Sequence, residues 1–282
     1  MMERAAQVPR PTESYCVIAR GELPAQPAEA AQAVARATGR VLFDVTRDLQ
    51  NRVGVLAVGL TRDEADRAVG CLSQARVSAF TLRESELVQF PDPVFLETAR
   101  LGEDALEVAD LRDGRNMRLG AVNVPYPDII CLATACVRRR TEEKYGQDDP
   151  DWILNPGLCS SDFHDGASIN AAYQFTIKPR TRTLWHSDHF LDFFAVKPAH
   201  HLRLNAATFN FTQTGMKLQP TSIGNLVEFI QALAPMCEQA EIDPSVRHIL
   251  DGNPLTNLRC SSTAQYDAYL SWRIQLLYHP DT

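Results

Sequence analysis

The stretch from Tyr15 to Arg83 constrains the fold most, because its order of elements can be followed residue by residue. Tyr15–Ala19 and Gly54–Val58 are short apolar runs typical of buried strands. Between them alanine and valine recur at helical spacing, and Gly39 stands where a helix ends in the left-handed region. Because these signals agree, they predict a compact domain in the order strand, helix, short helix, strand, helix, strand.

The helices and the last strand of this stretch carry their own start signals. Thr61 and Glu64 form the Thr-x-x-Glu pattern of a capping box, so a helix is expected to begin after Thr61. Asp44 is expected to cap a short helix that runs through Leu49. Val77–Leu82 then closes the unit as a strand.

Two segments carry a resemblance to a known family: Ala37-Thr-Gly39 at the end of the first long helix, and Val55–Ala65 leading into the last one. The stretch resembles the C-terminal domain of the bacterial ribosomal stalk protein, a fold shared with ClpS-type protease adaptors. The resemblance covers residues 15–83 and implies a protein-binding module. The stalk domain engages elongation factors through a lysine-bearing helical face, whereas the corresponding segment here, Val41–Asp48, contains no lysine.

The sequence after this stretch changes character. Pro91 and Pro93 interrupt regular structure, and Val94–Leu101 is expected to form a helical turn within a linker. The chain as a whole is predicted to be α+β. Its expected parts are a flexible tail at residues 1–13, a small βααβαβ domain at 14–88, a linker at 89–115, and a β-rich domain with C-terminal helices at 116–282.

The pattern of the second domain is one of successive strands followed by helices. Strands are expected at 122–126, 128–137, 171–177 and 181–186, a long loop at 145–166, a hairpin within 191–211, and helices that begin near Ser222, Pro244 and Ser262. With the opening Pro-Tyr-Pro-Asp-Ile-Ile at 125–130, this order weakly resembles a pleckstrin-homology-like barrel over residues 116–240. Such domains bind proteins or lipid head groups.

Composition excludes several classes of function. A net charge of −7 argues against a nucleic-acid binder, and no apolar run approaches the ~20 residues of a membrane span. Seven scattered cysteines without a CxxC pair indicate reduced thiols in a cytoplasmic protein. No phosphate-binding glycine loop or nucleophile elbow is present, so we expect neither a cofactor nor a metal. The oligomeric state is left open.

One constellation favours an enzyme. His186-Ser-Asp188, followed by His248 and the basic Arg259, resembles the iron triad and cosubstrate-binding residue of 2-oxoglutarate oxygenases. That family holds its ligands on strands, whereas His248 is predicted to lie in a short helix. A metal-dependent oxygenase is therefore the alternative to the favoured interpretation, a non-catalytic adaptor that binds another protein.

The basic cluster of the chain is the candidate binding site. It consists of Arg138, Arg139, Arg140 and Lys144. Its functional interpretation is recognition of an acidic peptide or a phosphate, and the alternative is a solvated strand end. His200 and His201 are expected at a hairpin tip, as part of a solvated turn.

Overall fold

The structure is a computed structural model that describes residues 13–21, 28–145, 180–197, 199–253 and 259–280. It divides into two compact units, Met1–Val137 with Asp188–Thr282, and Arg138–Ser187. The domain boundaries predicted at residues 88 and 116 fall inside the first unit and stay predictions. The loop expected at 145–166, apart from its first residue, and the strand expected at 171–177 lie outside the described residues.

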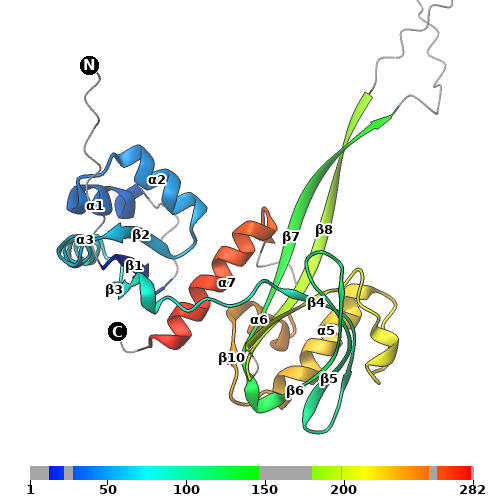
Figure 1. Cartoon of the computed structure of the whole chain (residues 1–282). Helices are drawn as coiled ribbons and strands as arrows, with labels where there is room; N and C mark the ends of the chain where they lie inside the picture. Colours follow the sequence, from blue (N-terminus) through cyan, green and yellow to red (C-terminus); the bar gives the residue numbers. More distant parts are fainter. Residues whose placement is uncertain (1–12, 22–27, 146–179, 198, 254–258, 281–282) are drawn as a thin grey trace, which may run out of the picture. The chain divides into compact units, whose positions relative to one another are not determined.

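The fold is α+β, as predicted, and the first elements follow the predicted order (Figure 1). They are β1 (Tyr15–Ala19), α1 (Ala28–Thr38), α2 (Leu42–Asn51), β2 (Val55–Leu60), α3 (Arg62–Gln74) and β3 (Ala79–Arg83). The strands form an antiparallel sheet in the order β2-β1-β3. The three helices pack their alanine-rich and valine-rich faces on one side of this sheet.

Local start and stop signals are partly confirmed. Thr61 caps α3, and its capping box with Glu64 is complete in both directions. Gly39 has a φ of 69°, the left-handed conformation expected at the end of α1. Asp44 is not a cap: α2 begins at Leu42, one turn earlier than expected, with Val41 as its N-cap residue. Asp44 lies instead in the first turn, where a carboxylate still interacts favourably with the helix dipole.

Strand β1 is apolar throughout because both of its faces are buried. Val17 and Ala19 face the helices of the first sheet, whereas Cys16 and Ile18 face α7 (Thr263–Tyr278). The indole Nε1 of Trp272 on α7 donates a hydrogen bond of 2.8 Å to the carbonyl of Ala19. Helix α7 thus covers the face of the small sheet that its own helices leave open.

The segment expected to be a linker contains two strands, and the helical turn predicted at Val94–Leu101 is wrong. After η1 (Glu84–Glu86), β4 (Val94–Leu101) and β5 (Ala105–Arg112) form an antiparallel hairpin. The two prolines precede β4 and do not interrupt it, since a strand tolerates proline at its start. In β5 the buried residues Leu106 and Val108 alternate with exposed ones, which is the period of a strand.

The larger sheet contains the remaining strands. After β5 the chain forms these elements in order: β6 (Arg118–Pro125), η2 (Tyr126–Asp128), β7 (Ile129–Tyr145), β8 (Arg180–Val196), β9 (Ala199–Asn205), η4 (Phe211–Gln213), α5 (Ser222–Leu233), η5 (Ala234–Met236), β10 (Glu241–Ile242), α6 (Pro244–Leu250) and β11 (Arg259–Cys260). The strand order of the larger sheet is β10-β7-β8-β9-β4-β5-β6, with β11 paired to β7. The predicted hairpin is present, because Val196 pairs with Ala199. Helices begin at or next to Ser222, Pro244 and Ser262, as expected.

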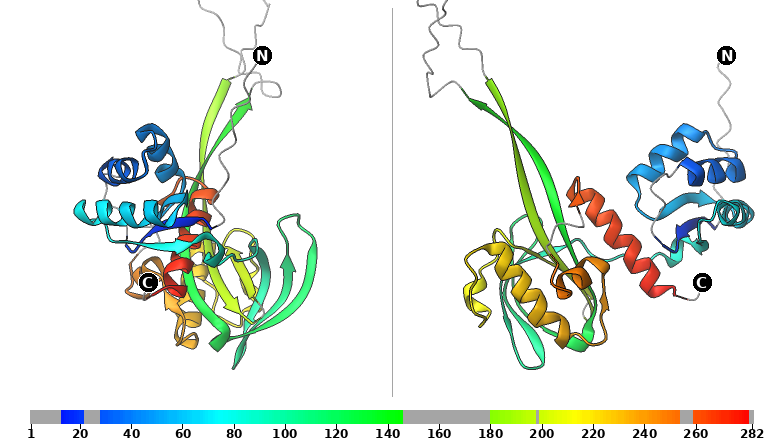
Figure 2. Two further views of the ribbon diagram at one scale, coloured as in Figure 1. Left: turned by 60° about the vertical axis from the view of Figure 1, so that its left-hand side comes forward. Right: turned by 180° about the vertical axis from the view of Figure 1, so that it is seen from behind.

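Helices cover both faces of the larger sheet within the first unit (Figure 2). On one face Phe229 and Leu233 of α5 join the cluster around Leu191 and Phe193 of β8. On the other face α7 contacts the cluster around Phe190 and Phe194. Strand β8 therefore sends alternate side chains to α5 and to α7, which places its polar residue Asp192 on the α7 side.

The cysteines of the described residues are free, and five of the six are buried. Burial raises the pKa of Cys16 and of Cys237 to about 12. These thiols stay protonated and unreactive at neutral pH. No helix in the described part of the chain is long and apolar enough to span a membrane.

Candidate functional site

The predicted basic cluster lies on β7, at the start of the second unit. Arg138, Arg139 and Arg140 are all exposed. Because side chains of a strand alternate, Arg138 and Arg140 lie on one face and Arg139 on the other. Arg140 forms an ion pair of 2.9 Å with Glu142, two residues further on the same face. The side chain of Lys144 lies outside the described residues.

A tryptophan that the sequence analysis did not single out completes one face of this cluster. The guanidinium carbon of Arg138 lies over the ring of Trp185 on β8, 5.0 Å from the ring centroid. Trp185 is nevertheless 59% exposed. An exposed cation–π contact of this kind contributes about 0.5–1 kcal/mol and keeps the charge of the arginine accessible. We call Arg138, Arg140 and Trp185 together the Arg–Trp face.

The second cluster of functional groups is a buried charge network on the hairpin of β8 and β9. The strand register pairs Asp192 with Arg203 and Phe194 with His201. One carboxylate oxygen of Asp192, Oδ1, accepts hydrogen bonds from His201 Nε2 at 2.5 Å and from Arg203 Nε at 2.7 Å. Asp192 is fully buried and Arg203 is 1% exposed. A charge this deep is tolerated because it is paired.

Helix α7 supplies the second partner of Arg203. The guanidinium donates a hydrogen bond of 2.7 Å to Oδ1 of Asp267, and its carbon lies 5.2 Å from the ring centroid of Phe190 and 5.3 Å from that of Tyr266. Burial alone would lower the pKa of Arg203, but the carboxylates of Asp192 and Asp267 outweigh it and raise that pKa. Arg203 therefore stays charged and ties β9 to α7.

The phenol of Tyr266 is fully buried beside this network. Burial, reinforced by the negative charge of Asp192, raises its pKa well above the ordinary value for tyrosine. The phenol of Tyr266 is therefore neutral at physiological pH.

The prediction that His201 lies in a solvated turn is wrong. It is 6% exposed and its ring stacks on Phe194 with centroids 4.3 Å apart. The hairpin turns between Val196 and Ala199, so His201 lies inside β9. The sequence pattern suggested a tip because two adjacent histidines are usually hydrated, and only the strand pairing shows that Asp192 and Phe194 cover this one.

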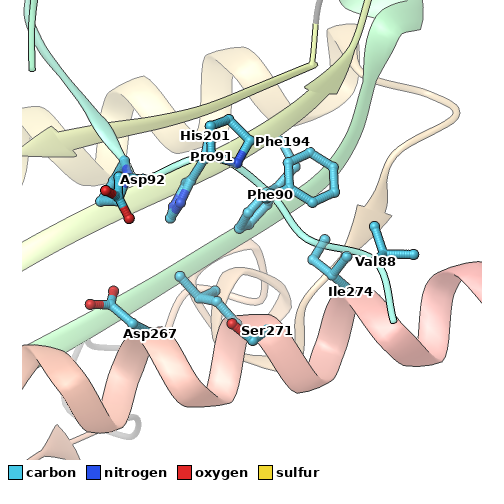
Figure 3. A pocket seen from close by; sticks show the side chains of 11 residues that line it. Val88, Phe90, Pro91, Asp92, Phe194, His201, Asp267, Ser271 and Ile274 are labelled. Atoms are coloured by element: carbon cyan, nitrogen blue, oxygen red, sulfur yellow. The ribbon is translucent and has the colours of Figure 1, made fainter. Parts of the chain in front are cut away.

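A cavity of about 140 Å³ lies between α7, the β8–β9 hairpin and the segment that precedes β4 (Figure 3). Four of its lining residues recur at helical spacing on α7: Asp267, Leu270, Ser271 and Ile274. Phe194 and His201 line it from the strands, and residues 88 and 90–93 line it from the third side. In Figure 3 Asp92, His201 and Asp267 lie toward one end and Phe90, Val88 and Ile274 toward the other.

The four residues of the oxygenase hypothesis lie on three different elements, β8, α6 and β11. His186 lies in the second unit and is exposed, and Asp188 is half-buried in β8 of the first unit. His248 lies on α6, in the short helix that was predicted. Arg259 belongs to β11, and its side chain is outside the described residues. Among the residues that the structure describes, no three histidine, cysteine or acidic side chains lie close enough to hold a metal ion.

No protein-family model, no characterised protein sequence and no solved structure matches this chain. Function is therefore inferred from the chemistry of the Arg–Trp face and of the cavity.

Proposed function

We propose that this protein is a non-catalytic cytoplasmic adaptor that binds an acidic segment of another protein through the Arg–Trp face. The observation that carries the proposal is the exposed contact between Arg138 and Trp185, with Arg140 on the same side of the strand. Tryptophan and arginine are the residue types that contribute most often to the binding energy of protein interfaces. A guanidinium also matches the geometry of a carboxylate, with which it forms paired hydrogen bonds.

The spacing of the two arginines suggests the form of the partner. Residues two apart on one face of a strand are separated by about 6.6 Å. An extended acidic segment with carboxylates at alternate positions has the same spacing, so it can meet Arg138 and Arg140 together. Its intervening atoms would then lie near the ring of Trp185. The chain carries a net charge of −7, so this basic face differs in sign from the molecule as a whole.

The stalk-like resemblance of residues 15–83 supports a protein-binding role, but not the translational one. The segment Val41–Asp48 contains no lysine. Val41, Leu42 and Phe43 are exposed at the start of α2 instead. A partner at this helix would therefore meet apolar side chains, whereas the stalk family presents cations there. The pleckstrin-homology-like resemblance of residues 116–240 stays a prediction.

Charge reversal at both arginines of the face is expected to weaken acidic-peptide binding at least about tenfold at low salt, a loss of ~1.4 kcal/mol or more. The variant is Arg138→Glu with Arg140→Glu in the full chain, and the probe is a fluorescent peptide of alternating glutamate and threonine. Affinity is measured by fluorescence anisotropy. The difference from the unmodified protein should shrink as salt is raised, since screening weakens exposed charge pairs.

Arg139→Glu is the control, because it reverses the charge of one arginine on the opposite face of β7 and leaves the Arg–Trp face unchanged. It is expected to retain most of the affinity. A control peptide with glutamine in place of glutamate should not bind measurably to the unmodified protein or to the double variant. The proposal fails if the double variant binds the acidic peptide as tightly as the unmodified protein, or if Arg139→Glu alone has the larger effect.

A further inference from the structure

We propose that the cavity between α7 and the β8–β9 hairpin binds a primary alkylammonium group, with the charged end at Asp92, His201 and Asp267. This site goes beyond the proposed recognition of an acidic segment: it lies in the first unit, it shares no residue with the Arg–Trp face, and it selects the opposite charge.

Two carboxylates face each other at the polar end of the cavity (Figure 3). Asp92 is exposed, and no hydrogen bond or ion pair joins it to a residue that the structure describes. Asp267 binds Arg203 through Oδ1, which leaves Oδ2 for a ligand. Asp267 comes from α7 and Asp92 from the segment before β4, on opposite sides of the cavity, so a cation between them would be held from two directions.

His201 adds a third polar group from a buried position. Its Nε2 lies 2.5 Å from the carboxylate oxygen of Asp192. A carboxylate only accepts hydrogen bonds, so Nε2 carries a proton and donates it in the hydrogen bond to Asp192. Nδ1 makes no hydrogen bond within the described part of the chain, although His201 is 6% exposed and lines the cavity. The remaining hydrogen-bonding atom of a nearly buried ring is thus left for a ligand.

The acceptors define the chemistry of the ligand. The carboxylates of Asp92 and Asp267 offer only acceptors, so the complementary group must be rich in donors. A primary ammonium carries three donors and no acceptor. Charge agrees with this assignment, because the three carboxylates of Asp92, Asp192 and Asp267 outnumber the single guanidinium of Arg203. An anionic ligand would be repelled.

The opposite end of the cavity fits an alkyl chain. Phe90 and Phe194 meet edge to face there with ring centroids 5.0 Å apart, beside Val88 and Ile274. A volume of 140 Å³ corresponds to about five water molecules of ~30 Å³ each, and hence to a ligand of about five non-hydrogen atoms. This is the size of n-butylammonium, which is also the end of a lysine side chain. The alkyl part gains from burial while the ammonium is paired with carboxylates.

Isothermal titration of the full chain with n-butylammonium and with n-butanol tests the proposal. The two probes share shape and size but differ in charge. We expect n-butylammonium to bind at least about tenfold more tightly, since a bound cation paired with carboxylates is worth more than ~1.4 kcal/mol. Asp92→Asn should lower the affinity for n-butylammonium about tenfold. Asp104→Asn, an exposed aspartate at the β4–β5 turn, makes the same change elsewhere and should have no effect.

The source of the ammonium is distinguished by further probes. A short peptide with a central lysine that binds more tightly than n-butylammonium identifies a lysine side chain of a partner. Equal or weaker binding of that peptide identifies a free alkylamine. Ser271→Phe, an exposed position on α7 that lines the cavity, should block both probes by filling the space.

Equal affinity for n-butanol and n-butylammonium overturns the proposal, as does unchanged amine binding by Asp92→Asn or by Ser271→Phe. The Arg138→Glu, Arg140→Glu variant should bind the amine normally, so failure at the Arg–Trp face and failure at the cavity are separate results.

Discussion

Asp192→Ala is expected to destabilise the protein by about 3–5 kcal/mol, because it removes the buried carboxylate that serves both Arg203 and His201. The guanidinium of Arg203 is 1% exposed and would keep only Asp267 as a partner. His201 would lose its one hydrogen bond to the network. Urea unfolding followed by circular dichroism measures the loss at neutral pH.

Asp267→Ala is the control for this result, since it removes the other carboxylate of the same guanidinium. The side chain of Asp267 is 43% exposed, so solvent screens its ion pair. The expected cost is about 1 kcal/mol or less. If the two substitutions destabilise the protein equally, burial of Asp192 is not what makes it important, and the network has been assigned the wrong centre.

Gly54→Ala is expected to cost more than Gly39→Ala, although both glycines have a left-handed backbone with φ of 72° and 69°. Strain from a positive φ should cost about 1 kcal/mol at either position. At Gly54 a methyl group would also lie 2.1 Å from Cγ of Trp272, whereas nothing lies within 4 Å of a methyl group at Gly39. The rearrangement that relieves this overlap adds about 1–3 kcal/mol to the loss of stability.

Thermal or urea unfolding of the two variants measures this difference. A larger loss at Gly54 supports the close packing of α7 on the loop before β2, through the ring of Trp272. Equal losses would contradict that packing, because backbone strain would then account for both.

The first six elements were predictable because local signals decide them. The capping box of Thr61 and Glu64, the left-handed Gly39 and the apolar strands act over a few residues, and each agrees with its neighbours. The helical turn predicted at Val94–Leu101 was wrong because the prediction gave more weight to Pro91 and Pro93 than to the weak alternation of apolar and polar residues in this segment. That alternation gains its meaning only from pairing with β5 and β9.

The two candidate sites were only partly predictable, since both depend on pairing between distant strands. The arginines of the basic cluster were identified, but their division between two faces and the contact of Arg138 with Trp185 follow from β7 lying beside β8. His201 was assigned to solvent because nothing in its neighbourhood along the chain reveals Asp192. The register of β8 with β9 brings these residues together.

Fluorine NMR of the full chain labelled with fluorotryptophan tests the central claim most directly. The chain has three tryptophans, and Trp185→Phe assigns the resonance of Trp185. On addition of the alternating glutamate peptide, the Trp185 resonance should shift with the same dissociation constant that anisotropy gives, while that of buried Trp272 stays in place. If the peptide saturates the protein and the Trp185 resonance does not move, the Arg–Trp face is not the binding site.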